Sequence, residues 1–184
     1  LIHAMIDQDD LNAIEAKDGV LNTYYKLRDE KITRFIGISC HTDPTLMKTA
    51  IERHDIDCAQ MALNVAHTGM TKKMVMTGSM EHSFENLALP AALKKNLGVI
   101  AIKTFGQDGL IGKAPIETLI RYTLTLPVST AILGMPRLEY IEENIRIAKA
   151  FQPLSKPQMI QIGHRLARQN KLALDRFFQH HVDA

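Results

Sequence analysis

The residues with the clearest chemical potential follow a short apolar segment, residues 35–39. Ser39 ends this segment, and Cys40 and His41 come directly after it. A hydroxyl, a thiol and an imidazole can hydrogen-bond a ligand, and an imidazole can also transfer a proton. In a barrel of parallel strands, ligands bind at the carboxyl ends of the strands. These three side chains are therefore expected to lie in a binding site.

Lys103 offers a second kind of chemistry. It follows the apolar segment 99–102, and Phe105 lies just beyond it. Apolar surroundings favour the neutral form of an amine, and a neutral amine can form a Schiff base with a carbonyl substrate. A Schiff-base aldolase that uses Lys103 is therefore one hypothesis. A covalent adduct at Lys103 after borohydride reduction would support it.

Gln60 and the histidines complete the candidates that the residues themselves suggest. Gln60 interrupts the apolar segment 58–63, and an amide in such surroundings needs a hydrogen-bonding partner, either a ligand or a neighbouring group. His41, His54 and His67 have neither HxxxH nor HExxH spacing, so no metal site is predicted.

The elements that must position these residues alternate along the chain. Strands are predicted at residues 1–3, 35–39, 58–63, 99–102 and 130–133. Helices are predicted at 19–29, after Asp43-Pro44, and at 84–95, 116–124 and 138–151. A last helix begins at the capping box of Ser155 and Gln158 and runs to about residue 170. The acidic segment at residues 7–10 is predicted to be a turn, and residues 64–83 a long loop.

This alternation is typical of repeated βα units around a parallel sheet. Phe35, Ile36 and Ile38 show no polar alternation, which indicates a strand buried on both faces. A closed barrel filled by side chains needs about eight strands and roughly 250 residues. We therefore predict an α/β chain, a single domain over residues 1–184, that holds strands 4 to 8 of a (β/α)8 TIM barrel. The sequence starts at Leu1-Ile2-His3 without an initiator Met, which is consistent with a barrel whose earlier units precede Leu1.

Composition excludes several partners. The formal net charge is +2, with 46% hydrophobic and 23% charged residues, and no basic stripe with interleaved aromatic residues suggests nucleic acid. The apolar runs are too short to span a bilayer. Cys40 and Cys58 lack CxxC spacing, which favours a reducing, cytoplasmic location. Nothing in the sequence predicts an oligomeric state.

An ordered set of short motifs resembles the aldo/keto reductase superfamily. The set covers nearly the whole chain up to Ser155 and consists of Leu1-Ile2-His3, Arg34-Phe35-Ile36-Gly37-Ile38-Ser39, Gln60, Gly98-Val99-Ile100-Ala101, Ile132-Leu133-Gly134 and Glu142-Glu143-Asn144. The resemblance implies the carboxyl-terminal portion of the family's (β/α)8 barrel, from strand four onward. It also implies a nicotinamide dinucleotide cofactor, NADP or alternatively NAD, bound without a Rossmann domain. Consistently, no GxGxxG follows a predicted strand.

The resemblance implies roles for residues around the nicotinamide. His3 matches the active-site histidine that helps to hold the carbonyl oxygen of the substrate. Ser39 and Gln60 match positions that hydrogen-bond the carboxamide, and Cys40 falls where many members have Asn. Ile102 lies where many members stack an aromatic ring on the nicotinamide.

Further residues match the rest of the dinucleotide site. The loop that passes near the pyrophosphate is matched by Lys103, Thr104, Phe105 and Gly106. The turn after the last strand is matched by Gly134, Met135 and Pro136. Glu143 and Asn144 match the adenine contacts, and Tyr140 stands about where an arginine often meets the 2′-phosphate. This last position leaves the choice between NADP and NAD open.

The family's catalytic tyrosine, lysine and aspartate come from units before strand four. Tyr24, Tyr25, Tyr122 and Tyr140 all fall on predicted helices. We therefore expect the full-length parent to reduce small aldehydes or ketones to alcohols by hydride transfer, and the chain from Leu1 alone to be inactive. Aldehyde-dependent NADPH oxidation by a chain beginning at Leu1 would refute the second expectation. The alternative from another class is a regulatory module that binds a nicotinamide nucleotide without efficient turnover.

Overall fold

A single parallel sheet forms the centre of the computed structural model, which describes residues 1–70, 76–77 and 79–166. Its strands lie in the order β1-β2-β3-β6-β7, and every neighbouring pair is parallel. The strands are β1 (Ile2–Met5), β2 (Gly37–Cys40), β3 (Cys58–Ala62), β6 (Gly98–Ile102) and β7 (Thr130–Ala131). Spatial order therefore equals chain order, which is the connectivity of a (β/α) barrel. The predicted α/β class with five parallel strands is confirmed.

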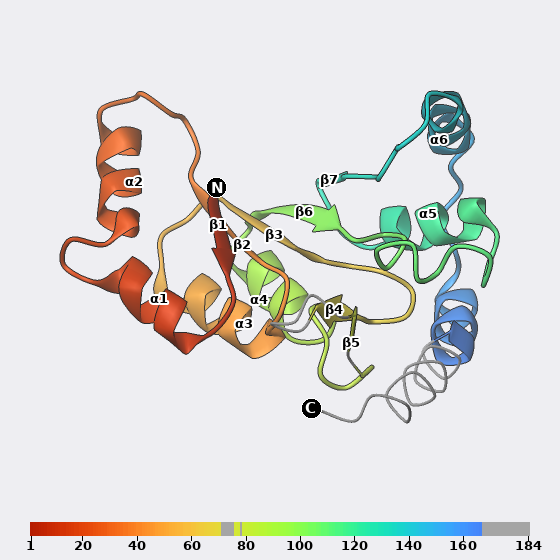
Figure 1. The fold of residues 1–184 in the computed structure, drawn as a ribbon, viewed down its shortest axis with the longest axis horizontal. Coiled ribbons are helices and arrows are strands. Elements are labelled where there is room, and N and C mark those ends of the chain that lie inside the picture. The colour runs from red at the N-terminus through yellow and green to blue at the C-terminus, as the bar shows by residue number, and fades with distance from the viewer. Residues whose placement is uncertain (71–75, 78, 167–184) are drawn as a thin grey trace, which may run out of the picture.

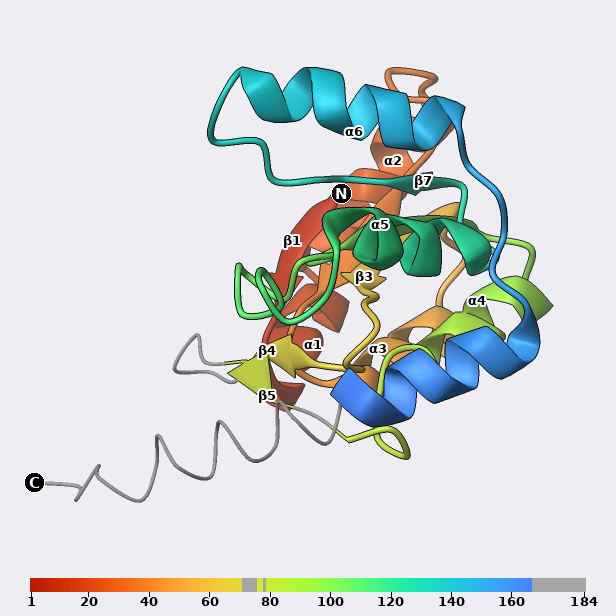
Figure 2. The same ribbon diagram turned by 90° about the vertical axis from the view of Figure 1, so that its right-hand side faces the viewer.

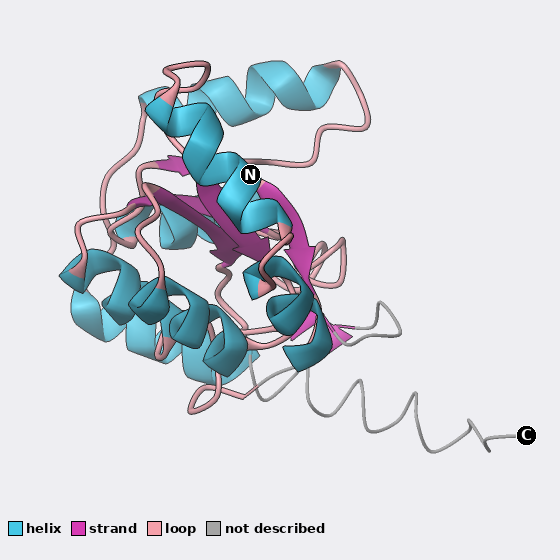
Figure 3. Cartoon of the chain, turned by 90° about the vertical axis from the view of Figure 1, so that its left-hand side faces the viewer, coloured by secondary structure: helices cyan, strands magenta, loops and turns pink. Residues whose placement is uncertain are grey.

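Helices occupy the connections between the strands. They are α1 (Gln8–Glu15), α2 (Val20–Asp29), α3 (Pro44–Arg53), α4 (Ala88–Lys94), α5 (Ile116–Thr125) and α6 (Glu139–Lys149), followed by helical residues 156–166. A small antiparallel pair, β4 (Gly69–Met70) and β5 (Met76–Thr77), lies outside the main sheet. Figure 1 shows α3 and α4 side by side, Figure 2 shows α6 beyond β7, and Figure 3 shows helices around the strands.

The start of α3 fixes the end of β2. The Asp43 carboxylate accepts hydrogen bonds from the backbone N–H groups of Thr45 and Leu46, at 2.7 and 3.1 Å, and Pro44 occupies the first helical turn. The Cys40 thiol donates to the carbonyl oxygen of Asp43 at 3.4 Å. The predicted Asp43-Pro44 helix start is thus confirmed, and the chain between strand and helix has a defined path.

The two faces of the sheet differ in burial. Ile38, Ala59, Met61, Val99 and Ala101 are at most 1% exposed, and they belong to one core cluster with residues of α3, α4 and α5. The residues that alternate with them along β3 and β6, Cys58, Gln60, Gly98 and Ile100, are only half-buried. Because neighbouring residues of a strand point to opposite faces, helices cover one face and leave the other open.

Several sequence predictions need correction. The predicted loop over 64–83 contains β4 and β5, the predicted helix over 84–95 is limited to Ala88–Lys94, and the predicted strand over 130–133 ends at Ala131. The predicted acidic turn is the start of α1, because the Asp7 carboxylate accepts from the backbone N–H groups of Asp9 and Asp10 and caps the helix. The first strand does not end at residue 3 but continues to Met5. The predicted strand over 35–39 begins only at Gly37, and Phe35 is 62% exposed, so it is not part of the core.

The last described helix begins as predicted. The Ser155 N–H and hydroxyl both lie within 2.9 Å of the Gln158 Oε1 atom, which is one half of a capping box. The predicted continuation to residue 170 lies partly outside the described residues. Among the described residues no helix is both long and apolar enough to cross a membrane. The single-domain assignment of 1–184 stays a prediction.

Candidate functional site

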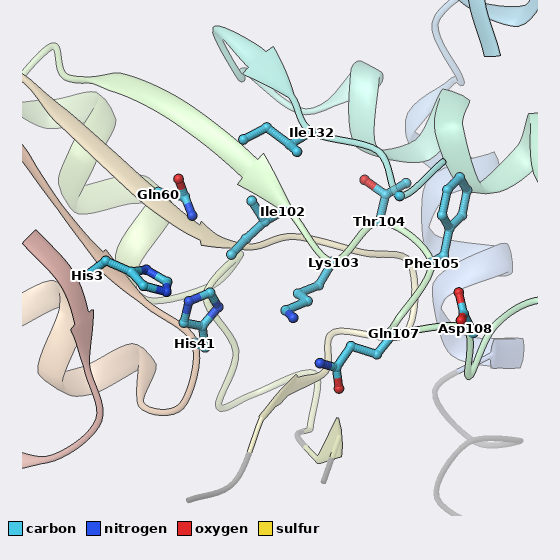
Figure 4. A pocket seen from close by; sticks show the side chains of 11 residues that line it. His3, His41, Gln60, Ile102, Lys103, Thr104, Phe105, Gln107, Asp108 and Ile132 are labelled. Carbon is cyan, nitrogen blue, oxygen red and sulfur yellow. The ribbon is translucent and has the colours of Figure 1, made fainter. Parts of the chain in front are cut away.

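A cleft of about 440 Å³ lies on the open face of the sheet and extends to the carboxyl ends of its strands. It is lined by His3, His41, Gln60, Ile102, Lys103, Thr104, Phe105, Gln107, Asp108, Ile132 and Gly134. These residues come from β1, β3 and β6 and from the segments that follow β2, β6 and β7. Figure 4 shows His3 and His41 side by side, with the Lys103 side chain pointing into the space between His41 and Gln107. Segments distant in the sequence thus share one site.

His3 and Ser39 are joined by a short hydrogen bond. The distance from His3 Nδ1 to Ser39 Oγ is 2.7 Å, and Ser39 is completely buried in β2. The bond engages one nitrogen of the His3 ring. The other nitrogen, Nε2, makes no hydrogen bond to the described residues, so it is available to a ligand.

His41 packs edge-on against His3, with 4.9 Å between the ring centroids and an interplanar angle of 89°. Burial lowers the pKa of His41 to about 4, and the neighbouring positive charges of His3 and Lys103 add to this effect. At neutral pH the His41 ring is therefore uncharged. It can accept or donate a hydrogen bond, but it is not a source of positive charge.

Two polar groups in the cleft are unengaged. Neither the Gln60 amide nor the Lys103 ammonium group makes a hydrogen bond or ion pair with the described residues. The loop after β6 has an unusual backbone, with φ of +62° at Lys103, +49° at Gln107 and +69° at Asp108. Backbone hydrogen bonds from Gly106 to Lys103, from Gly109 to Gly106 and from Leu110 to Phe105 hold this loop in a series of tight turns.

Three buried side-chain atoms of the described residues have no hydrogen-bonding partner: His41 Nδ1, Thr104 Oγ1 and Asn144 Nδ2. An orphaned buried polar atom costs about 1–3 kcal/mol, so such atoms are rare without a reason. His41 and Thr104 line the cleft, and Asn144 lies on α6.

The remaining predicted site residues lie outside the lining of the cleft. Cys40, the last residue of β2, is completely buried, and burial raises the pKa of its thiol. Gly106 lies in the loop after β6, with φ of +55°. Met135 is 46% exposed in the turn after β7. On α6, Tyr140 and Glu143 are half-buried and Asn144 is buried. The predicted cofactor roles of all these residues stay predictions.

His41 lines the cleft, as its position after a strand end predicts. Three lining residues were not among the predicted site residues: Gln107, Asp108 and Ile132. The sequence offered only a weak signal for Gln107 and Asp108, since glycines 106 and 109 flank them. The left-handed backbone that directs them into the cleft has no sequence signature at these residue types.

The cleft contains no cluster of metal-ligand type. Within the described ranges, no three His, Cys, Asp or Glu residues are placed so that they could hold a metal ion. Lys103 does line the cleft, so the aldolase hypothesis for this amine stays a prediction that borohydride trapping tests.

Comparison with known proteins shows the fold. No protein-family model matches the sequence, and no curated protein matches it either. Among solved structures, the holo form of an aldo-keto reductase from Bacillus halodurans aligns with a TM-score of 0.58 and 17% identity over 82% of this chain and 56% of that chain. Its apo form gives a TM-score of 0.57 at 16% identity, over 89% of this chain and 59% of that chain.

A thermostable aldo-keto reductase in complex with the inhibitor epalrestat is similar as well, with a TM-score of 0.52 and 19% identity over 78% of this chain and 53% of that chain. The chain therefore spans about half the length of these structures. At such low identity the likeness shows the fold alone. This chain has the fold of part of an aldo-keto reductase barrel, as the sequence motifs predict.

Proposed function

We propose that the cleft binds a nicotinamide dinucleotide, NADP or NAD, and that the protein containing this chain uses it to reduce small aldehydes or ketones to alcohols. The observation that carries the proposal is the convergence of available polar groups in the cleft. The Gln60 amide and the Lys103 ammonium group line it without a partner among the described residues, and the family resemblance assigns both residues to the cofactor.

The available groups in the cleft fit the parts of such a cofactor. The Gln60 amide can pair with the carboxamide of the nicotinamide, and the Ile102 side chain, 7% exposed, offers an apolar surface to the ring. The Lys103 ammonium group is suited to the negative charges of a pyrophosphate. The adenosine end would extend toward α6, where Tyr140, Glu143 and Asn144 lie.

The bound cofactor would supply a hydride to the carbonyl carbon of the substrate. His3 is suited to hold the carbonyl oxygen through Nε2, because Ser39 engages Nδ1 and fixes the ring. The protonation of that oxygen needs an acid within about 3 Å. Among the described residues no tyrosine lines the cleft. Tyr24 donates to the carbonyl oxygen of Leu1 and Tyr122 to Glu85. We therefore expect this chain to bind cofactor and not to turn over aldehydes.

A titration with NADPH tests the binding half of the proposal. The sequence contains no tryptophan, so the emission of bound NADPH can be followed without energy transfer from indole. We expect saturable binding, weakened at least about tenfold by Lys103→Ala, since a charge-assisted contact contributes roughly 1.5–3 kcal/mol. Lys94→Ala, at an exposed position of α4, is the matched control and should leave the affinity unchanged. Absence of saturable binding, or equal loss in both variants, would contradict the proposal.

A nicotinamide-nucleotide sensor would pass the same titration. The lack of a tyrosine in the described part of the cleft favours this second candidate for the chain by itself. Turnover separates the two functions: the intact parent should reduce aldehydes if it is a reductase, and should bind NADPH tightly with negligible reduction if it is a sensor. A reducing, cytoplasmic location is part of the proposal, and the free thiols of Cys40 and Cys58 support it.

A further inference from the structure

A second cavity, of about 460 Å³, lies between the segment before α4, helix α5 and the helical residues 156–166. Apolar side chains form much of its wall: Met80, Leu154, Met159 and Ile160. None of the residues around it lines the cleft on the open face of the sheet. This cavity is therefore independent of the proposed cofactor site, and its role is a separate question.

A chain of hydrogen bonds ends in this cavity at the carboxylate of Glu85. The Tyr122 hydroxyl lies 3.1 Å from each of the two Glu85 oxygens and 3.2 Å from His67 Nε2. Ser83 Oγ lies 3.4 Å from His67 Nδ1. A hydroxyl has one proton. If Tyr122 donates to Glu85, His67 must donate to Tyr122 through its Nε2–H group. The Ser83 hydroxyl, next to His67 Nδ1, also lies 3.3 Å from the Met80 carbonyl oxygen, to which it can donate.

Glu85 remains short of donors despite this arrangement. A carboxylate has about four acceptor positions, and Tyr122 is its only partner within hydrogen-bond distance among the described residues. His67 Nδ1 is 3.8 Å from Oε2. Burial raises the pKa of Glu85 to about 7, although the Tyr122 hydroxyl opposes this effect, whereas burial lowers the pKa of His67 to about 4. The ionised carboxylate, 18% exposed, thus faces an uncharged histidine and apolar walls.

We propose that this cavity binds a small primary amine with an apolar body, whose ammonium group donates to the Glu85 carboxylate. An ammonium group has donors and no acceptors, so it complements an acceptor-only carboxylate. The body of the ligand would pack against the methionine, leucine and isoleucine side chains. Lys156 also borders the cavity, but it is exposed and forms no ion pair with Glu85. An anionic ligand would be repelled by the carboxylate.

Calorimetric titration with n-hexylamine, at about pH 8, tests the proposal, with 1-hexanol as the neutral probe. We expect saturable binding of the amine and at least about tenfold weaker binding of the alcohol, because only the amine neutralises the buried charge. Glu85→Gln should weaken amine binding about tenfold or more. Glu117→Gln, at an exposed position of α5, is the matched control and should bind as the unchanged chain does.

Two further measurements make the outcome decisive. Near pH 6, amine binding should release a proton from Glu85, which appears as a heat that depends on the ionisation enthalpy of the buffer. Tyr122→Phe removes a competing donor, so it should retain amine binding or tighten it. Equal affinity of the amine and the alcohol, unchanged binding by Glu85→Gln when circular dichroism shows it folded, or loss in Tyr122→Phe as large as in Glu85→Gln, would overturn the proposal.

Discussion

Glu85 and His67 oppose each other in their effect on stability, although they share one hydrogen-bonded cluster. The folded chain holds the Glu85 proton up to about pH 7, whereas the unfolded chain loses it near pH 4.5. Its contribution to the free energy of unfolding therefore falls as the pH rises through this window. His67 has a pKa of about 4 when folded and 6.5 when unfolded, so its contribution rises over nearly the same range.

Glu85→Gln should separate the two opposite contributions to the free energy of unfolding. The variant lacks the falling contribution, so its free energy of unfolding should rise relative to that of the unchanged chain between about pH 4.5 and 7, by on the order of 3 kcal/mol at most. Urea unfolding of both proteins across this range measures the difference. A difference that does not vary with pH would show that Glu85 titrates normally in the folded chain.

Individual site residues were predictable where they stand at strand ends or interrupt apolar strands. Gln60 and Lys103 belong to this group, and both line the cleft with unengaged polar groups. Ser39 was placed at the right strand end, but its hydroxyl bonds His3, a contact that only the neighbouring strand could reveal. The sequence did not predict the cluster around Glu85. Ser83 and Tyr122 are 39 residues apart, and tertiary packing alone brings both of them to His67.

At the scale of elements, a helix could be predicted from the sequence where its start carries clear signals and the helix is long enough to show apolar periodicity. Asp43-Pro44 predicts the start of α3 because it combines a capping carboxylate with a proline in the first turn. Asp7 caps α1 in the same way, but this helix has only eight residues and two buried ones, Leu11 and Ile14. So short a helix shows too little apolar periodicity to be distinguished from a turn.

The cap of α3 gives a prediction of its own. Asp43→Ala should lower the free energy of unfolding by about 1 kcal/mol, because two backbone N–H groups lose their acceptor. Asp43→Asn keeps an oxygen at the same place and should cost much less. Chemical denaturation of the three proteins makes the comparison. Equal losses in both variants would show that the charge, and not the cap, is what stabilises the helix.

The whole molecule is a sheet with one covered and one open face. Strand order and helix connections followed from the alternation of apolar and helical patterns, since each βα unit is local in the sequence. The difference between the faces could not be predicted, because the apolar strands indicated burial on both sides. Half-buried Gln60 and Ile100, together with Ile132 at 53% exposure, show that the face carrying the cleft is not packed by the described residues.

Substitutions at two neighbouring residues of β3 test the difference between the covered and the open face of the sheet. Ala59→Leu inserts a larger side chain between the sheet and its helices, where no space remains, and should cost about 1–3 kcal/mol. Gln60→Leu points to the open face and should change stability by less than about 1 kcal/mol, while weakening NADPH binding. Unfolding and titration of both variants test this. A larger loss for Gln60→Leu would mean that the open face is packed in solution.

The proposed reductase function requires that the cleft at the strand ends bind a dinucleotide. Hydrogen–deuterium exchange with and without NADPH tests it directly. We predict slower exchange in the loop 103–109 and in α6, with no change in residues 83–87 or 156–166 around the second cavity. Protection confined to the second cavity, or no protection anywhere at saturating NADPH, would contradict it.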